Sequence, residues 1–449
     1  MNKQILHLAI PNIISNISVP LLGIVDMALM GHMDSDAYIG AIALGALIFN
    51  FIYWSLGFLR MGTSGFTAQA FGREDQQEAI LVFSRALFIA ISISLVMVVL
   101  QRPIEWLSFL LLEGETDVES LAMDYFRIRI WAAPATLGQF ALLGFFLGMQ
   151  NARFPMYVLV TANVINIIFN AIFVLVLDMG SNGVALGTVI AQYSGLLLAS
   201  CLLVKKYRYL FPYWNRKLML QWDRLKAFLM VNKDIFIRTM SLVLVFTFFT
   251  ATSASADAED QGADTILAVN SLLMQFFMFF SFLIDGFAHA AEALSGRFIG
   301  AKSRRNLNRS IRILFAWGTG IAVSFTFIYL LAGELILGLL TDNHEVIRNA
   351  APFFPWVVLV PLASFVAFIW DGIFIGATAG RQMRNAMLIS TLLVFFPSYY
   401  LLNPLIGNHG LWLAFILYML SRGVTMTFMR KKALQIATTK SISTSPATT

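Results

Sequence analysis

Asp26 lies in an otherwise apolar run near the N-terminus, "VPLLGIVDMALM". Steps of four, three, four and three residues place it on one helical face with Asn12, Asn16, Val19 and Gly23. A carboxylate in membrane hydrocarbon costs about 2.5–3.5 kcal/mol on insertion scales. We therefore expect this polar or small face to point into a protein interior, where Asp26 has a functional role.

Pro20 interrupts the same run six residues before Asp26. It cannot donate a backbone hydrogen bond to the residue four positions earlier, so it permits a kink. An acid beyond such a hinge is suited to a conformational switch. The alternative is that Asp26 only caps the outer end of the helix, but four more apolar residues follow it.

Three asparagines, Asn163, Asn166 and Asn170, share a face of a later apolar run, "NVINIIFNAIF". Amides in a membrane helix can bind neighbouring helices together, so a structural role is one interpretation. In the other, Asn166 and Asn170 form hydrogen bonds with the acid of the first run. The residues alone leave both open.

The second half of the chain has its own ionisable residues in apolar runs. Asp285, His289 and Glu292 share a helical face in "IDGFAHAAEALSG", and Asp371 lies within "FIWDGIFIGAT". Ionisable groups inside a membrane are functional candidates by default. The chain has no HExxH pattern, so we expect no bound metal.

The elements that carry these residues are membrane-spanning helices. The chain is 58% hydrophobic and only 12% charged, with a mean hydropathy of +0.75, whereas an ordinary globular domain is about 25% charged. About twelve apolar runs have the length of a transmembrane helix. We expect an all-α integral membrane protein. Asp234 and Arg238, four residues apart in the seventh run, are expected to form a structural pair.

The Lys and Arg residues predict the orientation. With the N-terminus inside, nearly all of them fall in inner loops, while outer loops such as "LEGETDVES" and "ADAEDQGADT" are acidic. We expect a multi-pass protein of the plasma (inner) membrane with both termini in the cytoplasm. A nucleic-acid partner is excluded because no domain-sized soluble segment carries the basic residues.

The chain also repeats itself at an offset of 228 residues. Gly144 and Gly372 differ by this number, as do Arg153 and Arg381. Two homologous halves with an even number of spans are parallel repeats. We expect a first lobe of six spans over residues 1–207, a cytoplasmic linker over 208–231, a second lobe over 232–432 and a disordered tail over 433–449.

No nucleotide-binding or hydrolase motif is present. The sequence therefore predicts neither an enzyme nor an organic cofactor. An ion gradient is the remaining energy source, and a protonatable acid can couple to it.

Several segments together resemble the MATE (multidrug and toxic compound extrusion) family, and most of all its DinF branch. They are "LAIPNIISNISVPLLGIVDMALMGHM", "AQAFGRED", "SGRFIGAK", "NVINIIFNAIFV" and "WDGIFIGAT". The resemblance implies two pseudo-symmetric six-helix lobes around a central cleft. It implies an antiporter that exports amphipathic, often cationic, compounds in exchange for H⁺ or Na⁺. It also implies that Asp26 is the protonation site and Pro20 the hinge.

Two departures from the family pattern bear on the coupling ion. Asn170 stands where related proton-coupled members have an acid, which leaves Asp26 as the main acid of the first lobe. The seventh span has no central carboxylate to partner Asp371. A Na⁺-coupled antiporter that uses Asp371, Asp285 and Glu292 is therefore the alternative. A flippase for lipid-linked precursors and a non-transport scaffold are further alternatives. We expect a monomer with small-molecule substrates in the lipid bilayer.

Overall fold

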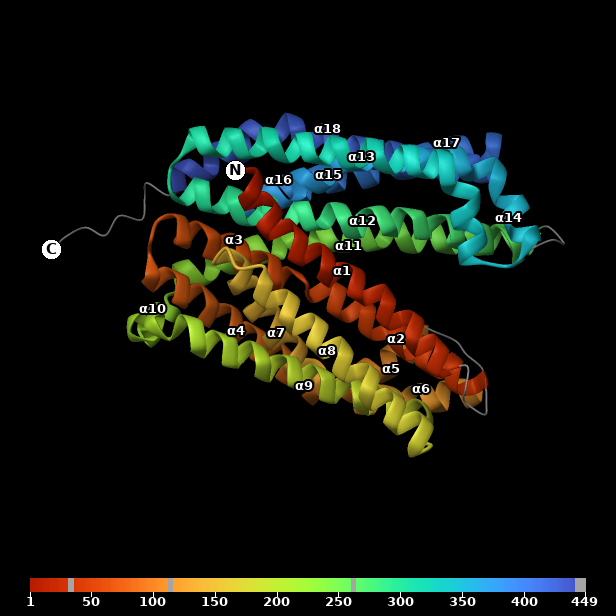
Figure 1. Cartoon of the computed structure of the whole chain (residues 1–449), viewed down its shortest axis with the longest axis horizontal. Helices are drawn as coiled ribbons and strands as arrows, with labels where there is room; N and C mark the ends of the chain where they lie inside the picture. The colour runs from red at the N-terminus through yellow and green to blue at the C-terminus, as the bar shows by residue number, and fades with distance from the viewer. Residues whose placement is uncertain (31–35, 112–115, 260–263, 441–449) are drawn as a thin grey trace. The chain divides into compact units, whose positions relative to one another are not determined.

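The computed structural model describes residues 1–30, 36–111, 116–259 and 264–440 (Figure 1), and the side chain of Asp26 lies outside this description. The described residues form helices and no strand. The α-helices are α1 (Asn2–Met30), α2 (Asp36–Leu56), α3 (Phe58–Gly72), α4 (Gln76–Val99), α5 (Gln101–Leu111), α6 (Thr116–Arg129), α7 (Ala133–Gly148), α8 (Arg153–Ala171), α9 (Gly180–Tyr207), α10 (Arg216–Met219), α11 (Trp222–Glu259), α12 (Asp264–Gly300), α13 (Arg304–Leu340), α14 (His344–Ala350), α15 (Phe354–Gly376), α16 (Gly380–Ile389), α17 (Phe396–Ile406) and α18 (Asn408–Lys440). Short 3₁₀ or π segments join some of them: η1 (Ile130–Ala132), η2 (Ile172–Val176), η3 (Arg208–Tyr213), η4 (Ala351–Phe353) and η5 (Ser390–Phe395).

Eleven helical segments of the described residues are long and apolar enough to cross a membrane. Several consist of consecutive helices, such as α2 with α3 over Ala37–Gly72. Helix α1 has 29 residues, about 43 Å at 1.5 Å per residue, which exceeds a hydrocarbon core of about 30 Å. The predicted fold class, an all-α integral membrane protein, is confirmed.

The chain forms two compact units. The first unit is Ile10–Asn232, and the second combines Met1–Ala9 with the chain from Lys233 onward. In the first unit α3 packs on α7, α8 on α9 and α2 on α6; in the second, α15 packs against α12, α13 and α18. Both interiors are rich in aromatic side chains, including Phe49 and Phe126 in the first unit and Phe276 and Trp412 in the second.

Equivalent glycines allow the same close helix approach in both units. A Cβ on Gly144 of α7 would lie 2.4 Å from the carbonyl oxygen of Arg60 on α3. A Cβ on Gly372 of α15 would lie 2.0 Å from the carbonyl oxygen of Ala288 on α12. Only glycine fits at such a distance, so residues 228 apart have one packing role.

The turns repeat at the same offset. Glu74 and Lys302, 228 residues apart, have φ angles of 59° and 53°. Gln150 and Thr378, also 228 apart, have φ angles of 60° and 51°. Left-handed backbone is uncommon for non-glycine residues. Its recurrence at matched positions shows that the sequence repeat is also a repeat of the fold.

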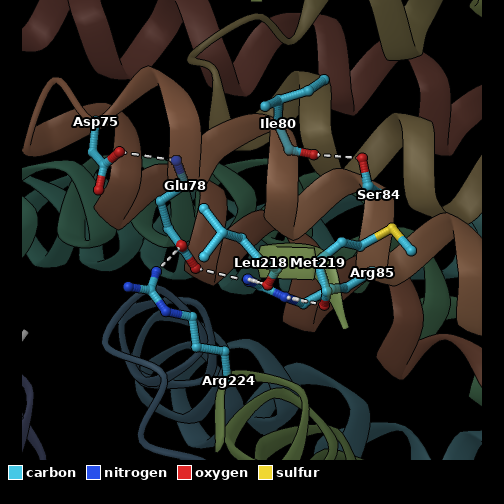
Figure 2. Close-up of polar contacts among 8 residues, drawn as sticks. All are labelled: Asp75, Glu78, Ile80, Ser84, Arg85, Leu218, Met219 and Arg224. Carbon is cyan, nitrogen blue, oxygen red and sulfur yellow. Dashed lines mark hydrogen bonds and ion pairs between the residues drawn. The ribbon is translucent and has the colours of Figure 1, made fainter. Parts of the chain in front are cut away.

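The segment expected as a linker, 208–231, is largely helical. It contains η3, α10 and the start of α11. Arg85 of α4 holds it against the rest of the first unit (Figure 2). The Arg85 Nε donates to the carbonyl oxygen of Met219 at 3.0 Å, and Nη2 donates to that of Leu218 at 3.1 Å. These carbonyls end α10, so a guanidinium caps its C-terminus.

Glu78 completes this contact. Its Oε1 accepts from Arg85 Nη1 at 2.8 Å, and its Oε2 pairs with Arg224 at the start of α11 (Figure 2). Asp75 caps α4, the helix that carries Glu78 and Arg85, because its carboxylate accepts from the backbone N–H of Glu78 at 2.9 Å. The four residues form a polar clamp between α4 and the linker, which we call the Arg85 clamp.

Two stretches differ from the expected course of the chain. Helix α5, between the third and fourth spans, was not anticipated; its Glu105 is buried and accepts from Arg127 Nη2 at 2.7 Å. Helix α18 continues to Lys440, so residues 433–440 are helical rather than part of a disordered tail. No Gly or Pro follows Gly423 in α18 to end the helix. Residues 441–449 of the expected tail lie outside the described residues.

Candidate functional site

On the face of α1 that carries the polar stripe, residues are buried near the start of the helix and exposed further along it. Asn12 is buried, whereas Val19 is 56% exposed. A Cβ on Gly23 would meet no atom within 4 Å. Asn12 is thus buried, as the polar stripe predicts, whereas Val19 and Gly23 are exposed in the part of the chain that the structure describes. Asp26 follows these exposed residues in α1, and its side chain is outside the described part of the structure.

Asn163, Asn166 and Asn170 lie on α8 and connect it to two other helices. Asn170 Nδ2 donates to Asn166 Oδ1 at 3.1 Å, and Asn166 Nδ2 donates to Thr188 Oγ1 of α9 at 3.1 Å. The Thr188 hydroxyl donates to the carbonyl oxygen of Val184 at 2.9 Å. These bonds all run in one direction, which polarises each successive donor.

Asn163 connects α8 to α1. Its Nδ2 donates to Ser18 Oγ at 2.9 Å. The Ser18 hydroxyl donates to the carbonyl oxygen of Ser15 at 2.7 Å, a local bond of the kind that bends helices. The contact therefore lies two residues before Pro20, just before the exposed residues Val19 and Gly23 of α1.

Helix α9 makes room for Asn170 with a glycine. Asn170 is fully buried, and a Cβ on Gly187 would lie 2.2 Å from its Oδ1. Any larger residue at position 187 would displace the amide. The packing of α8 on α9 thus sets the position of the hydrogen-bonded series Asn170–Asn166–Thr188, which we call the asparagine chain.

A buried ion cluster occupies the second unit. Asp371 of α15 accepts through Oδ2 from Arg422 Nη2 of α18 at 2.8 Å, and the same oxygen pairs with Arg238 Nη2 of α11. All three residues are buried, Arg422 to 2% exposure. One carboxylate and two guanidinium groups leave this cluster, the Arg–Asp–Arg triad, with a net charge of +1.

The triad corrects one expectation. Arg238 pairs with Asp371 rather than with Asp234, and Asp234 instead binds Arg384 Nη1 of α16 at 2.6 Å. Both bonds cross between helices, because packing turns the two side chains of α11 toward different neighbours. Helical spacing alone favoured the wrong partner.

Asp285, His289 and Glu292 lie together on α12, as their spacing predicts. His289 Nδ1 is 3.5 Å from Glu292 Oε2, and Glu292 is fully buried. Among the residues that the structure describes, no group of three or more His, Cys, Asp or Glu side chains is placed to hold a metal ion.

Three residues of these sites were absent from the sequence-based candidates. Ser18 and Thr188 give no signal of their own, since single hydroxyl residues are common in membrane helices. Arg422 is a lone cation in the last apolar span, and its cost in hydrocarbon was the one signal that could have marked it.

Comparison with known proteins gives matches over nearly the whole chain. The MatE family model matches residues 11–172 and again residues 239–401. The two matches begin 228 residues apart, the offset of the internal repeat. DNA damage-inducible protein F of Escherichia coli (strain K12) is 37% identical over 95% of this chain and 91% of its own length. The probable multidrug resistance protein NorM of Bacillus subtilis (strain 168) is 23% identical over 96% of each chain.

Solved structures share the fold. One, described as the outward-facing conformation of a multidrug resistance MATE family transporter of the MOP superfamily, has a TM-score of 0.83 at 19% identity, over 97% of this chain and 96% of the other. Another, described as MATE in the bent conformation, has a TM-score of 0.84 at 20% identity, over 98% and 97%.

Proposed function

Because this chain belongs to the MatE family of multi-pass membrane proteins, we propose that it is a secondary active multidrug efflux antiporter. It exports amphipathic, cationic compounds in exchange for protons. Asp26 of α1 is the main coupling acid. The names of two relatives support the proposal: that of multidrug and toxin extrusion protein 1 of Danio rerio refers to extrusion, and that of the Bacillus subtilis protein above refers to multidrug resistance.

The observation that carries the proposal is the Asn163–Ser18 hydrogen bond, because it sets the register of α8 and α1. The two helices run in the same direction (Figure 1). From this contact, Asn170 lies seven residues further along α8 and Asp26 eight residues further along α1. At 1.5 Å per residue these steps are about 10 Å and about 12 Å. The buried asparagine chain therefore ends at the depth of Asp26.

This placement supports a simple exchange. The ionised carboxylate of Asp26 attracts the positive charge of a substrate, and a proton taken up from outside neutralises it and releases the substrate. Pro20, between the Asn163 contact and Asp26, lets the second half of α1 bend during the exchange. One proton inward for one monovalent cation outward moves no net charge across the membrane, so the pH gradient is the driving force of this exchange.

The Arg–Asp–Arg triad argues against Na⁺ coupling in the second unit. Asp371, the acid which that alternative needs most, already accepts from two guanidinium groups. A Na⁺ ion would enter a cluster whose net charge is already positive. We therefore propose H⁺ as the coupling ion. We also propose that the protein is a monomer of the inner membrane with both termini in the cytoplasm.

Transport by reconstituted protein tests the proposal. Vesicles with an imposed pH gradient are loaded with a cationic fluorescent dye, and three variants are compared: Asp26→Asn, Asp371→Asn and Asp234→Asn. We expect only Asp26→Asn to abolish dye transport driven by the pH gradient when rates are compared per amount of folded, reconstituted protein. Asp371→Asn is expected to lower that amount, because it weakens the Arg–Asp–Arg triad. Wild-type transport by Asp26→Asn would refute its role. A strict requirement for Na⁺ at fixed membrane potential would overturn the proton assignment.

A further inference from the structure

The positive charge of the chain is concentrated in one short segment. Residues 205–226 contain seven Lys and Arg residues and one acid, Asp223. The net charge of this segment is +6, equal to that of the whole 449-residue chain. Only Arg224 of these cations has a carboxylate partner in the described residues, Glu78 in the Arg85 clamp. Lys205, Lys206, Arg216 and Lys217 are exposed.

Large aromatic side chains are exposed among these cations. Tyr209 is 53% exposed, Trp214 is 49% exposed and Trp222 is 64% exposed. Phe211 and Tyr213 are exposed as well. Exposed aromatic rings beside Lys and Arg, at the end of a membrane helix, are typical of segments that lie at the headgroup level of a bilayer.

The segment is held in a defined position on the first unit. Tyr207, Leu210 and Phe228 are buried. The rings of Tyr207 and Phe146 stack at a centroid distance of 5.9 Å. The Arg85 clamp fixes α10 between these anchors (Figure 2). Its cations and rings are thus presented together, without the entropy cost of ordering a free loop.

We propose that residues 205–226 form a binding surface for anionic phospholipids of the bilayer. The cations bind the phosphate groups of the lipids, and the aromatic rings insert among the headgroups. Clusters of four to eight basic residues beside a membrane helix bind anionic lipids in this way. The proposal depends on neither the transported compound nor the coupling ion.

The second unit supplies a matched control. Lys302, Arg304, Arg305 and Arg309 are exposed cations at the junction of α12 and α13. No large apolar side chain is exposed between residues 301 and 316. Residues 301–316 have a net charge of +5, close to the +6 of the proposed surface, without its exposed aromatic rings.

Native mass spectrometry of the purified full-length protein tests the proposal. The protein is released from vesicles of phosphatidylglycerol and phosphatidylcholine in equal amounts, and the ratio of the two bound lipids is measured. One variant replaces Lys205, Lys206, Arg216 and Lys217 by Gln, and the control variant replaces Lys302, Arg304, Arg305 and Arg309 by Gln. All eight side chains are exposed, although Lys206 also lies over the rings of Phe154 and Tyr207. The thermal unfolding of both variants is therefore measured to verify that they retain the fold.

We expect the first variant to lower the preference for phosphatidylglycerol by roughly tenfold or more, since each cation near an anionic surface contributes about a fivefold factor. The control should retain most of the wild-type preference. Equal losses in both variants would reduce the effect to bulk charge attraction and overturn the proposal, as would no loss in the first. Displacement of bound phosphatidylglycerol by inorganic phosphate would assign a soluble anion instead of the bilayer.

Arg85→Gln separates the effect of holding residues 205–226 in position from the effect of their charge on lipid binding. It leaves every cation of residues 205–226 in place and removes three bonds of the Arg85 clamp. We expect an intermediate preference for phosphatidylglycerol together with faster proteolysis of the segment. A preference as low as that of the fourfold variant, with unchanged proteolysis, would contradict the role given to the cations.

Discussion

Asp371 on α15 and Arg422 on α18 form a buried ion pair at 2.8 Å, and Arg238 of α11 binds the same carboxylate oxygen. This relationship joins three helices of the second unit around one negative and two positive charges. It leaves Asp371 with its charge already more than compensated. The polar contacts of α8 in the first unit are of another kind, because they join amides to the hydroxyls of Ser18 and Thr188.

We predict that Asp371→Leu destabilises the protein by about 3–5 kcal/mol, because it leaves two buried guanidinium groups without their shared counter-charge. The triple variant Arg238→Met, Asp371→Leu and Arg422→Met should unfold close to the wild type, since it removes all three charges. Unfolding in mixed micelles measures both. The prediction fails if the single variant is as stable as the triple variant.

Gly187→Ala is expected to disturb the asparagine chain directly. Its Cβ would lie 2.2 Å from Asn170 Oδ1, and overpacking of this kind costs about 1–3 kcal/mol. Dye transport should fall with stability. Gly23→Ala is the control, because a Cβ there meets no atom within 4 Å. Equal effects of the two substitutions on unfolding would show that the Asn170 contact is unimportant.

The contribution of the Asn163–Ser18 hydrogen bond to the free energy of unfolding can be measured in a double-mutant cycle of Asn163→Leu and Ser18→Ala. Hydrogen bonds between membrane helices couple by about 0.6 kcal/mol on average and by at most about 1.7. We expect a coupling energy within this range and slower dye transport in each single variant. Strictly additive unfolding energies would mean that the bond does not link α1 to α8.

Arg85→Ala should destabilise the first unit by about 3 kcal/mol, as expected when one partner of a buried ion pair is removed. The loss also leaves the carbonyl groups of Leu218 and Met219 without their donor. Arg102→Ala is the control, because the Arg102 side chain is 68% exposed and its pair with Glu105 is long, at 3.4 Å. An ion pair with such an exposed partner contributes about 0–1 kcal/mol. Similar losses in both variants would contradict the buried role of Arg85.

The sequence by itself determined the properties that depend on local pattern. Hydropathy located the spans, because each must cover the same thickness of hydrocarbon. The 228-residue offset anticipated the matched glycines Gly144 and Gly372, because equivalent sequence folds into equivalent backbone. Helical spacing also placed Asn163, Asn166 and Asn170 on one face, since the period of an α-helix is constant.

Partners across helices were decided only by the tertiary structure. Arg238 lies four residues from Asp234, and nothing local indicates that it pairs with Asp371, 133 residues away. Thr188 binds Asn166 and Ser18 binds Asn163 because α9 and α1 each contact α8. Rotation and tilt of packed helices choose which side chains meet, and these depend on the shape of every neighbouring residue. The sequence could therefore show which residues face inward, while packing decided what each of them binds.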